Sequence, residues 1–268
     1  MRNRVIFSII SVLILINIAA SLQAEDDGVE VLLENAEKAF RKGNELLDIN
    51  PEQAAESYRA AVVFYESVIS GGTVNAALYY NTANCYLRLE KIGYAILNYR
   101  RALLYDPFDR QIRYNLDYAR DLQKNDFESR AENEILRILF FWHYLIPFGW
   151  KTIVLISANL IFWTAFILQQ IGLRLRNTLI IPLIILIAFG VSLGFDIRSS
   201  EIEYGVITAD STIGRLGDSL SYESAFDAPL YEGVEFKIKQ RRVGWILAEL
   251  PDGALVWFEE DDCGIVEE

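Results

Sequence analysis

The sequence predicts a multidomain membrane protein that combines an all-α helical-repeat part, a two-helix membrane hairpin and a small all-β part. Three observations support this fold class. Similar helical segments recur at a spacing of 34 residues in the N-terminal half, two apolar segments lie close together between residues 151 and 196, and short apolar runs broken by turn residues follow Tyr204. Because the three patterns do not overlap, each is assigned to its own region of the chain.

Composition restricts the function classes. The 268 residues are 52% hydrophobic and 23% charged, which excludes an intrinsically disordered chain. The net charge of −12 disfavours nucleic acid as a partner, since that affinity comes mainly from Lys and Arg on phosphates. With one His and two Cys, no nucleophile, base or metal-ligand cluster stands in a recognisable motif, so we expect no enzyme activity, no cofactor and no metal site.

The N-terminus predicts export. Arg2 and Arg4 precede an apolar stretch over residues 5–20, and small Ala24 comes just before an acidic run. This order is typical of a secretory signal peptide over residues 1–24. An uncleaved anchor is the alternative, and in both cases the segment that follows is exported.

Two apolar segments predict transmembrane helices over residues 151–173 and 177–196. They contain uncharged stretches of 22 and 19 residues, and about 20 residues cross the hydrocarbon core. Arg174 and Arg176 lie in the short connection, which we place in the cytoplasm because cytoplasmic loops favour basic residues. The chain is therefore expected in a bacterial inner membrane, with its N-terminal and C-terminal domains both periplasmic.

Small and polar residues in these spans suggest helix packing. Gly190 and Gly194 form a small-xxx-small pattern, and Asn159 can donate a hydrogen bond to a neighbouring helix. They are expected either to hold the hairpin together or to contact a helix of another membrane protein.

A shorter aromatic-rich stretch precedes the spans. Residues 129–150 are predicted to include a juxtamembrane amphipathic helix, because residues 138–150 are apolar but too few to span and contain aromatics that favour the headgroup level. His143, the only histidine, lies in this stretch. The alternative is that this helix simply packs under the repeat domain.

Residues 25–128 are predicted to form a helical-repeat domain. Three pairs of similar residues are 34 positions apart: Ala61 and Ala95, Tyr65 and Tyr99, Val68 and Ala102. This is the period of the tetratricopeptide (TPR) repeat, a helix–turn–helix unit that stacks into a solenoid. The best copy covers residues 76–109, where Gly93 is expected to allow the turn between the helices and Pro107 to end the second helix.

Stacked repeats of this kind leave a concave groove lined by side chains of the first helices. The predicted partner-binding residues are Asn44, Tyr80, Asn81, Asn84, Arg88 and Asn115. Their Asn side chains could hydrogen-bond a peptide backbone or a terminal carboxylate, and the alternative is that they serve helix packing alone.

Residues 200–268 are predicted to form a small β-barrel from short strands and tight turns. Arg215, the run of residues 230–234, Gly244-Trp245 and Asp252-Gly253 resemble a bacterial Src-homology-3-like (SH3-like) domain. That resemblance implies peptidoglycan binding as an alternative function. However, residues 249–268 carry eight acidic and no basic residues, which disfavours an anionic polymer.

The order of the parts is more specific than any one of them. A signal peptide, tetratricopeptide repeats, a two-span hairpin and an SH3-like domain, in that order, resemble the BatE family of the Bacteroides aerotolerance (Bat) group. The resemblance implies a periplasmic complex with Bat proteins that carry von Willebrand A domains, linked to oxygen or stress tolerance. We therefore expect a non-enzymatic membrane adaptor that presents two interaction modules to protein partners and contacts membrane lipid.

Overall fold

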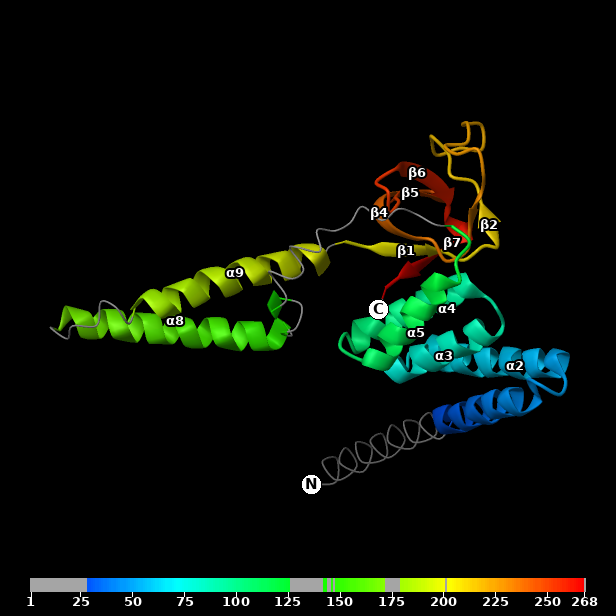
Figure 1. Cartoon of the computed structure of the whole chain (residues 1–268), viewed down its shortest axis with the longest axis horizontal. Helices are drawn as coiled ribbons and strands as arrows, with labels where there is room; N and C mark the ends of the chain where they lie inside the picture. The colour runs from blue at the N-terminus through cyan, green and yellow to red at the C-terminus, as the bar shows by residue number, and fades with distance from the viewer. Residues whose placement is uncertain are drawn as a thin grey trace, which may run out of the picture.

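The computed structural model describes residues 28–125, 142–143, 146, 148–171, 179–200 and 202–267. The predicted signal peptide and most of the predicted juxtamembrane helix over residues 129–150 lie outside the described residues. Residues 148–150 belong to the first long apolar helix. Figure 1 shows three parts, which we name the helical lobe (residues 28–125), the membrane hairpin (148–200) and the sheet domain (202–267).

The helical lobe consists of successive antiparallel helices. After a helix over residues 28–46, the helices are α2 (Pro51–Ser70), α3 (Ala76–Arg88), α4 (Ile92–Tyr105) and α5 (Arg110–Asp121). Asn50, Asn75 and Asp109 cap α2, α3 and α5, because each side-chain oxygen accepts a hydrogen bond from a backbone N–H of the first turn. The helix–turn–helix predicted over residues 76–109 is present as α3 and α4.

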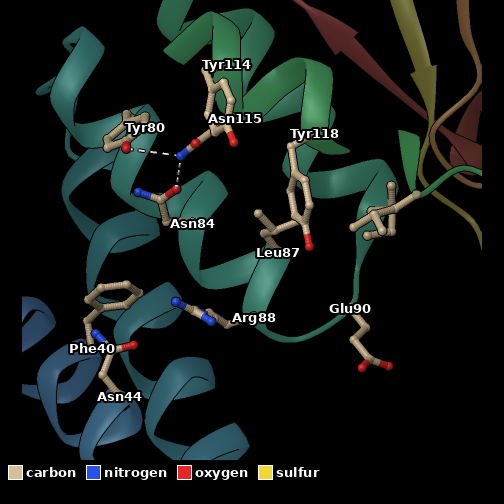
Figure 2. A pocket seen from close by; sticks show the side chains of 12 residues that line it. Phe40, Asn44, Tyr80, Asn84, Leu87, Arg88, Glu90, Tyr114, Asn115 and Tyr118 are labelled. Carbon is tan, nitrogen blue, oxygen red and sulfur yellow. Dashed lines mark hydrogen bonds between the residues drawn. The ribbon is translucent and has the colours of Figure 1, made fainter. Parts of the chain in front are cut away.

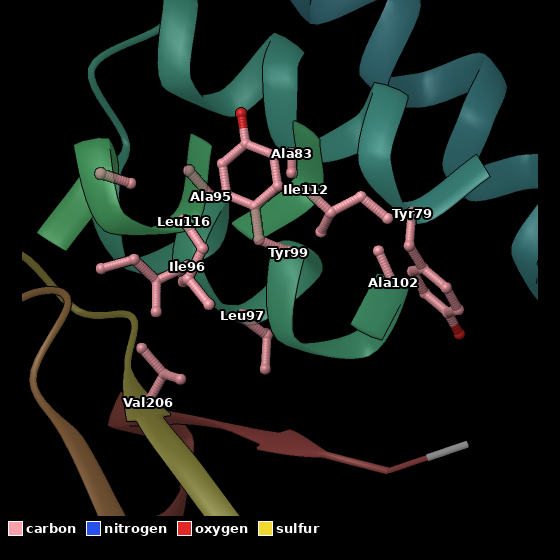
Figure 3. Close-up of a cluster of buried hydrophobic side chains, with 11 residues drawn as sticks. Tyr79, Ala83, Ala95, Ile96, Leu97, Tyr99, Ala102, Ile112, Leu116 and Val206 are labelled. Atoms are coloured by element: carbon pink, nitrogen blue, oxygen red, sulfur yellow. The ribbon is translucent and has the colours of Figure 1, made fainter. Parts of the chain in front are cut away.

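Helix α4 is the centre of the lobe. Ala95, Ile96, Tyr99 and Ala102 are fully buried, and they join side chains of α3 and α5 in one apolar cluster (Figure 3). Val206 of the sheet domain belongs to the same cluster. The core of the helical lobe therefore continues into the sheet domain.

The sheet domain is antiparallel but is not the closed barrel that the sequence predicts. Its five-stranded sheet has the order β6-β5-β4-β1-β7, and β2 and β3 form a separate pair. The strands are β1 (Tyr204–Ile207), β2 (Ser211–Thr212), β3 (Leu230–Tyr231), β4 (Glu235–Arg242), β5 (Trp245–Glu249), β6 (Leu255–Glu259) and β7 (Cys263–Val266), with a 3-10 turn η2 (Glu260–Asp262) before β7. Because β7 crosses over to pair with β1, β6 and β7 occupy opposite edges and the sheet stays open.

Helix α4 packs on β1 and β7, and two glycines allow the approach. A Cβ atom at Gly93 would collide with the carbonyl oxygen of Ile207, and one at Gly264 would collide with Leu97. The sequence interpretation of Gly93 as a turn residue was wrong. The turn before α4 instead uses Glu90, whose φ is 58°, and Gly93 lies inside the helix, where its missing side chain leaves room for the sheet.

A charged cluster secures this α4–sheet interface. Glu235, at the start of β4, accepts hydrogen bonds from the guanidinium groups of Arg100 on α4 and Arg120 on α5. Burial raises the pKa of Glu235, but the charges and hydrogen bonds of the two arginines outweigh it and hold this pKa below the usual range. Arg101 also donates to the backbone oxygen of Ile265, at 2.8 Å.

The membrane hairpin pairs α8 (Phe148–Gln170) with α9 (Ile180–Ser200). Among the described residues, the helices long and apolar enough to cross a membrane are Phe148–Gln170 and Ile180–Ile197. Figure 1 shows them side by side, extending away from the other two parts. Compared with the predicted bounds, α8 begins and ends three residues earlier.

A polar cluster joins the two helices at the end nearest the sheet domain. Lys151, only 2% exposed, lies 2.7 Å from the carboxylate of Asp196 and 3.2 Å from Nδ1 of His143. Ser192 Oγ lies 2.7 Å from the same His143 nitrogen. A buried charge requires partners, and Lys151 of α8 finds its carboxylate on α9, so the cluster fixes how α8 and α9 are aligned.

Candidate binding groove

The first helices of the lobe enclose a groove of about 820 Å³ (Figure 2). It extends from the helix over residues 28–46, across α3, to α5. Side chains from these helices line it, including those of Phe40, Asn44, Tyr80, Asn84, Leu87, Arg88, Tyr114, Asn115 and Tyr118. The groove is thus formed where successive hairpins present the same face.

A repeated hydrogen bond supports the floor of the groove. Tyr58 of α2 donates to Asn44 Oδ1 at 2.8 Å, and Tyr99 of α4 donates to Asn84 Oδ1 at 2.6 Å. In both cases an Asn on the first helix of a hairpin is held by a Tyr on the second. Burial raises the pKa of Tyr99, so its hydroxyl stays protonated and remains a donor.

The third Asn extends the network across to α5. Asn115 donates from its amide nitrogen to Asn84 Oδ1 and to the Tyr80 hydroxyl, both at 3.1 Å, as Figure 2 shows. Asn84 Oδ1 therefore accepts two hydrogen bonds, while its own amide nitrogen has no partner among the described residues. The network fixes the side chain and leaves its N–H donors available to a ligand.

Within the part of the chain that the structure describes, the rest of the lining is largely aromatic and apolar, with one basic residue, Arg88, and one acidic residue, Glu90. Tyr114 and Tyr118 of α5 are 73% and 51% exposed, and together with Phe40 they place aromatic rings along the groove. Arg88 lies between them with no ion-pair partner among the described residues (Figure 2). The N–H groups of Asn84 and Arg88 can only donate hydrogen bonds, so the part of the groove around them suits a ligand rich in hydrogen-bond acceptors.

The structure places five of the six predicted groove residues together: Asn44, Tyr80, Asn84, Arg88 and Asn115. Asn81 lies elsewhere and interacts with the buried Tyr65 of α2. Asn81 and Asn84 are only three residues apart on α3, so they lie on neighbouring sides of the helix. The buried side of α3 faces α2, however, and the Asn81 side chain is directed there.

On the α5 side of the groove, sequence reasoning predicted Asn115 but missed its aromatic and apolar neighbours. Tyr114, Tyr118 and Leu122 are spaced four residues apart, a pattern that places them on one helix face. That spacing was a usable signal. In contrast, the cluster around Glu235 joins residues more than 100 positions apart, and no local pattern reveals it.

The small residues of the membrane hairpin do not hold it together. Gly190 and Gly194 are exposed, and a Cβ atom added to either would meet nothing within 4 Å. Asn159 is exposed as well. The hairpin instead packs through Ala158, Ala165 and Leu193, so contact of the glycines with another membrane helix stays a prediction.

No protein-family model, curated protein or solved structure matches the chain. Within the described part of the chain, no group of three or more His, Cys, Asp or Glu side chains is arranged to hold a metal ion. The groove, the hairpin and the contacts between the parts are the features from which a function can be inferred.

Proposed function

We propose that this chain is a non-enzymatic, membrane-anchored adaptor whose helical lobe binds an extended segment of a partner protein. The observation that carries the proposal is the groove, where a fixed Asn84 amide, the Arg88 guanidinium and exposed tyrosines face one space of about 820 Å³. The helical hairpins that form it support the assignment of residues 25–128 to the tetratricopeptide repeat.

The lining indicates how such a segment binds. An extended peptide offers a row of backbone carbonyl oxygens, which match the N–H donors of Asn84 and Arg88. Tyr114 and Tyr118 supply large, rigid contact surfaces with a polar end, the type of side chain enriched at protein interfaces. Arg88 adds a preference for an acidic side chain or a terminal carboxylate.

The membrane hairpin supplies the anchor. We infer that α8 and α9 cross a bacterial inner membrane and that both other parts lie on its periplasmic side. Two spans return the chain to the side from which it started, and the packing of α4 on β1 requires the helical lobe and sheet domain to share one compartment. The family resemblance favours Bat proteins that carry von Willebrand A domains as the partners.

Site-specific photo-crosslinking in cells tests the groove. A benzoylphenylalanine at Tyr118 is expected to capture a discrete protein partner, whereas the same group at Val63, exposed on α2 and outside the groove, is not. Arg88→Glu should abolish the Tyr118 adduct, and Arg59→Glu, an exposed change on α2, should leave it intact. Capture of lipid alone, or equal capture from both positions, would contradict the proposal.

A further inference from the structure

The turn between α4 and α5 exposes apolar side chains that neither the groove nor the α4–sheet interface uses. Leu104, Tyr105 and Phe108 are 42%, 37% and 41% exposed. They cluster within five residues, at the end of α4 and in the turn that follows. Exposed apolar side chains that gather in one place are typical of a surface that contacts another protein or a membrane.

Contacts with the sheet domain fix the direction of this turn. Helix α4 runs antiparallel to β1: its first turn meets the end of β1, where Gly93 approaches Ile207. Further along α4, Arg100 lies over the ring of Tyr204, the first residue of β1, with 5.8 Å between the guanidinium carbon and the ring centroid. The α4–α5 turn therefore projects past the beginning of β1.

The beginning of β1 is tied closely to the membrane hairpin. Helix α9 ends at Ser200 and β1 starts at Tyr204, so the connection spans at most about 14 Å. Figure 1 shows the start of β1 facing α9. If α9 leaves the bilayer at its last turn, the α4–α5 turn lies at the level of the headgroups.

A pocket of about 370 Å³ beside the turn is lined by Arg100, Arg113 and Arg120, with Asp117 as its acidic residue. Glu235 and Asp117 hold Arg120, and Glu235 holds Arg100. Arg113 differs from both: it donates to the backbone oxygen of Pro107 and stacks on the Phe108 ring, at 5.7 Å. No carboxylate in the described part of the chain pairs with it, so its charge is available to an anion.

We propose that the α4–α5 turn docks on the membrane surface, with Phe108 and Leu104 among the headgroups and Arg113 on the phosphate of an anionic phospholipid. The inference rests on the proposed crossing of the membrane by α8 and α9. Aromatic side chains prefer the headgroup level, and Arg binds phosphate through a planar pair of N–H donors.

The acidity of the whole chain does not oppose this contact. Although the net charge is −12, residues 100–120 contain five arginines and three aspartates. Electrostatic attraction to a charged surface falls off within about 10 Å at ordinary ionic strength, so the local charge governs the contact. The docked turn would be a second anchor, which holds the groove at a constant height and angle above the bilayer.

Lipid photo-crosslinking of the full chain in nanodiscs tests the proposal. Benzoylphenylalanine at Phe108 should yield lipid adducts, detected by mass spectrometry, and the same group at Val63 should not. Replacing part of the phosphatidylcholine with phosphatidylglycerol should raise the adduct yield at position 108 about fivefold, the effect expected for one arginine near an anionic surface. Arg113→Glu should remove this rise, and Arg59→Glu, equal in charge change, should preserve it.

The experiment distinguishes a failure of the membrane crossing from a failure of the docking of the turn. A chain that is not retained in nanodiscs would overturn the membrane crossing, and this inference with it. A retained chain without lipid adducts at position 108, or with adducts to a second copy instead, overturns only the docking of the turn. Equal yields in both lipids would overturn the role of Arg113. None of these results alters the outcome of crosslinking from Tyr118 in the groove.

Discussion

Two faces of the helical lobe differ in what covers them. The outer face of α4 is covered by the chain itself: Gly93 lets the backbone of Ile207 approach, Leu97 packs against Gly264, and the sheet domain buries this face. The groove on the opposite side is lined by large side chains, and Tyr114 and Tyr118 stay more than half exposed. On the surface that the chain fills, small and apolar residues are joined by arginines that already have their partners. The open surface instead keeps aromatic rings and N–H donors that are unpaired among the described residues, as a surface for a partner does.

The largest loss of stability is expected from a substitution that disrupts the interface between α4 and the sheet domain. Glu235→Ala leaves the guanidinium groups of Arg100 and Arg120 without their shared carboxylate. Removing one partner of a buried ion pair costs about 3 to 5 kcal/mol, and because both arginines are about one third exposed we expect about 2 to 3 kcal/mol. Denaturant unfolding of the full chain in detergent measures the change, and hydrogen exchange should increase in β1 and α4 together.

Asp218→Ala is the matched control for that variant. It removes an ion pair with Arg242, at 2.5 Å, on the exposed surface of the sheet domain. Exposed ion pairs contribute little to stability, so the unfolding free energy and the exchange of α4 should hardly change. Equal losses in the two variants would show that the Glu235 cluster has no special role in joining the parts.

Gly93→Ala should have the next largest effect. Alanine normally stabilises a helix by about 1 kcal/mol relative to glycine. Here the added methyl group meets the backbone oxygen of Ile207, and forcing such an overlap costs about 1 to 3 kcal/mol, so the net change should be destabilising. Gly28→Ala, where the methyl group would meet nothing within 4 Å, should be neutral or slightly stabilising in the same unfolding experiment.

The contribution of the α4–sheet interface to stability should also depend on pH. Because the pKa of Glu235 is lower in the folded chain than in the unfolded one, its contribution to stability is present above the ordinary carboxyl pKa and is lost as the pH falls through the lowered value. The difference in unfolding free energy between the wild-type chain and Glu235→Gln should therefore be full at pH 7 and shrink below about pH 4. A difference that stays constant down to pH 3 would rule out Glu235 as the titrating group.

Sequence periodicity predicted what depends on neighbours along the chain. The hairpin of α3 and α4, the two apolar helices and the runs that became β1, β4, β5 and β6 all follow from local patterns of apolar and turn residues. Most groove residues were predicted from the repeat pattern as well, because equivalent positions of the first helices recur in successive repeats. Strand β7 was missed because it lies in an acidic stretch and forms by pairing with β1, which is distant in the sequence.

The contact between the helical lobe and the sheet domain could not be predicted in this way. A glycine in a helix–turn–helix has two explanations, a turn or a close approach, and only the position of Ile207 decides for Gly93. Likewise, Lys151 and Asp196 are end residues of the two predicted spans, and their pairing depends on the register of α8 against α9. Both cases are decided by tertiary packing, which local spacing does not encode.

The smallest effect is expected on the open face. Tyr99→Phe removes one hydroxyl and its hydrogen bond to Asn84 Oδ1, which keeps a second donor in Asn115. A neutral hydrogen bond contributes about 1 kcal/mol, so the unfolding free energy should fall by about that amount, less than in Glu235→Ala. Tyr118→Phe, at an exposed hydroxyl, should change it by less than about 0.5 kcal/mol. The order of the groove nevertheless depends on Tyr99. With one of its two hydrogen bonds lost, the Asn84 amide is held less firmly, and the Tyr118 crosslink to a partner should weaken although the fold persists. If Tyr99→Phe left that crosslink unchanged, the Asn84 amide would be serving helix packing alone, and recognition would fall to Arg88 and the tyrosines of α5.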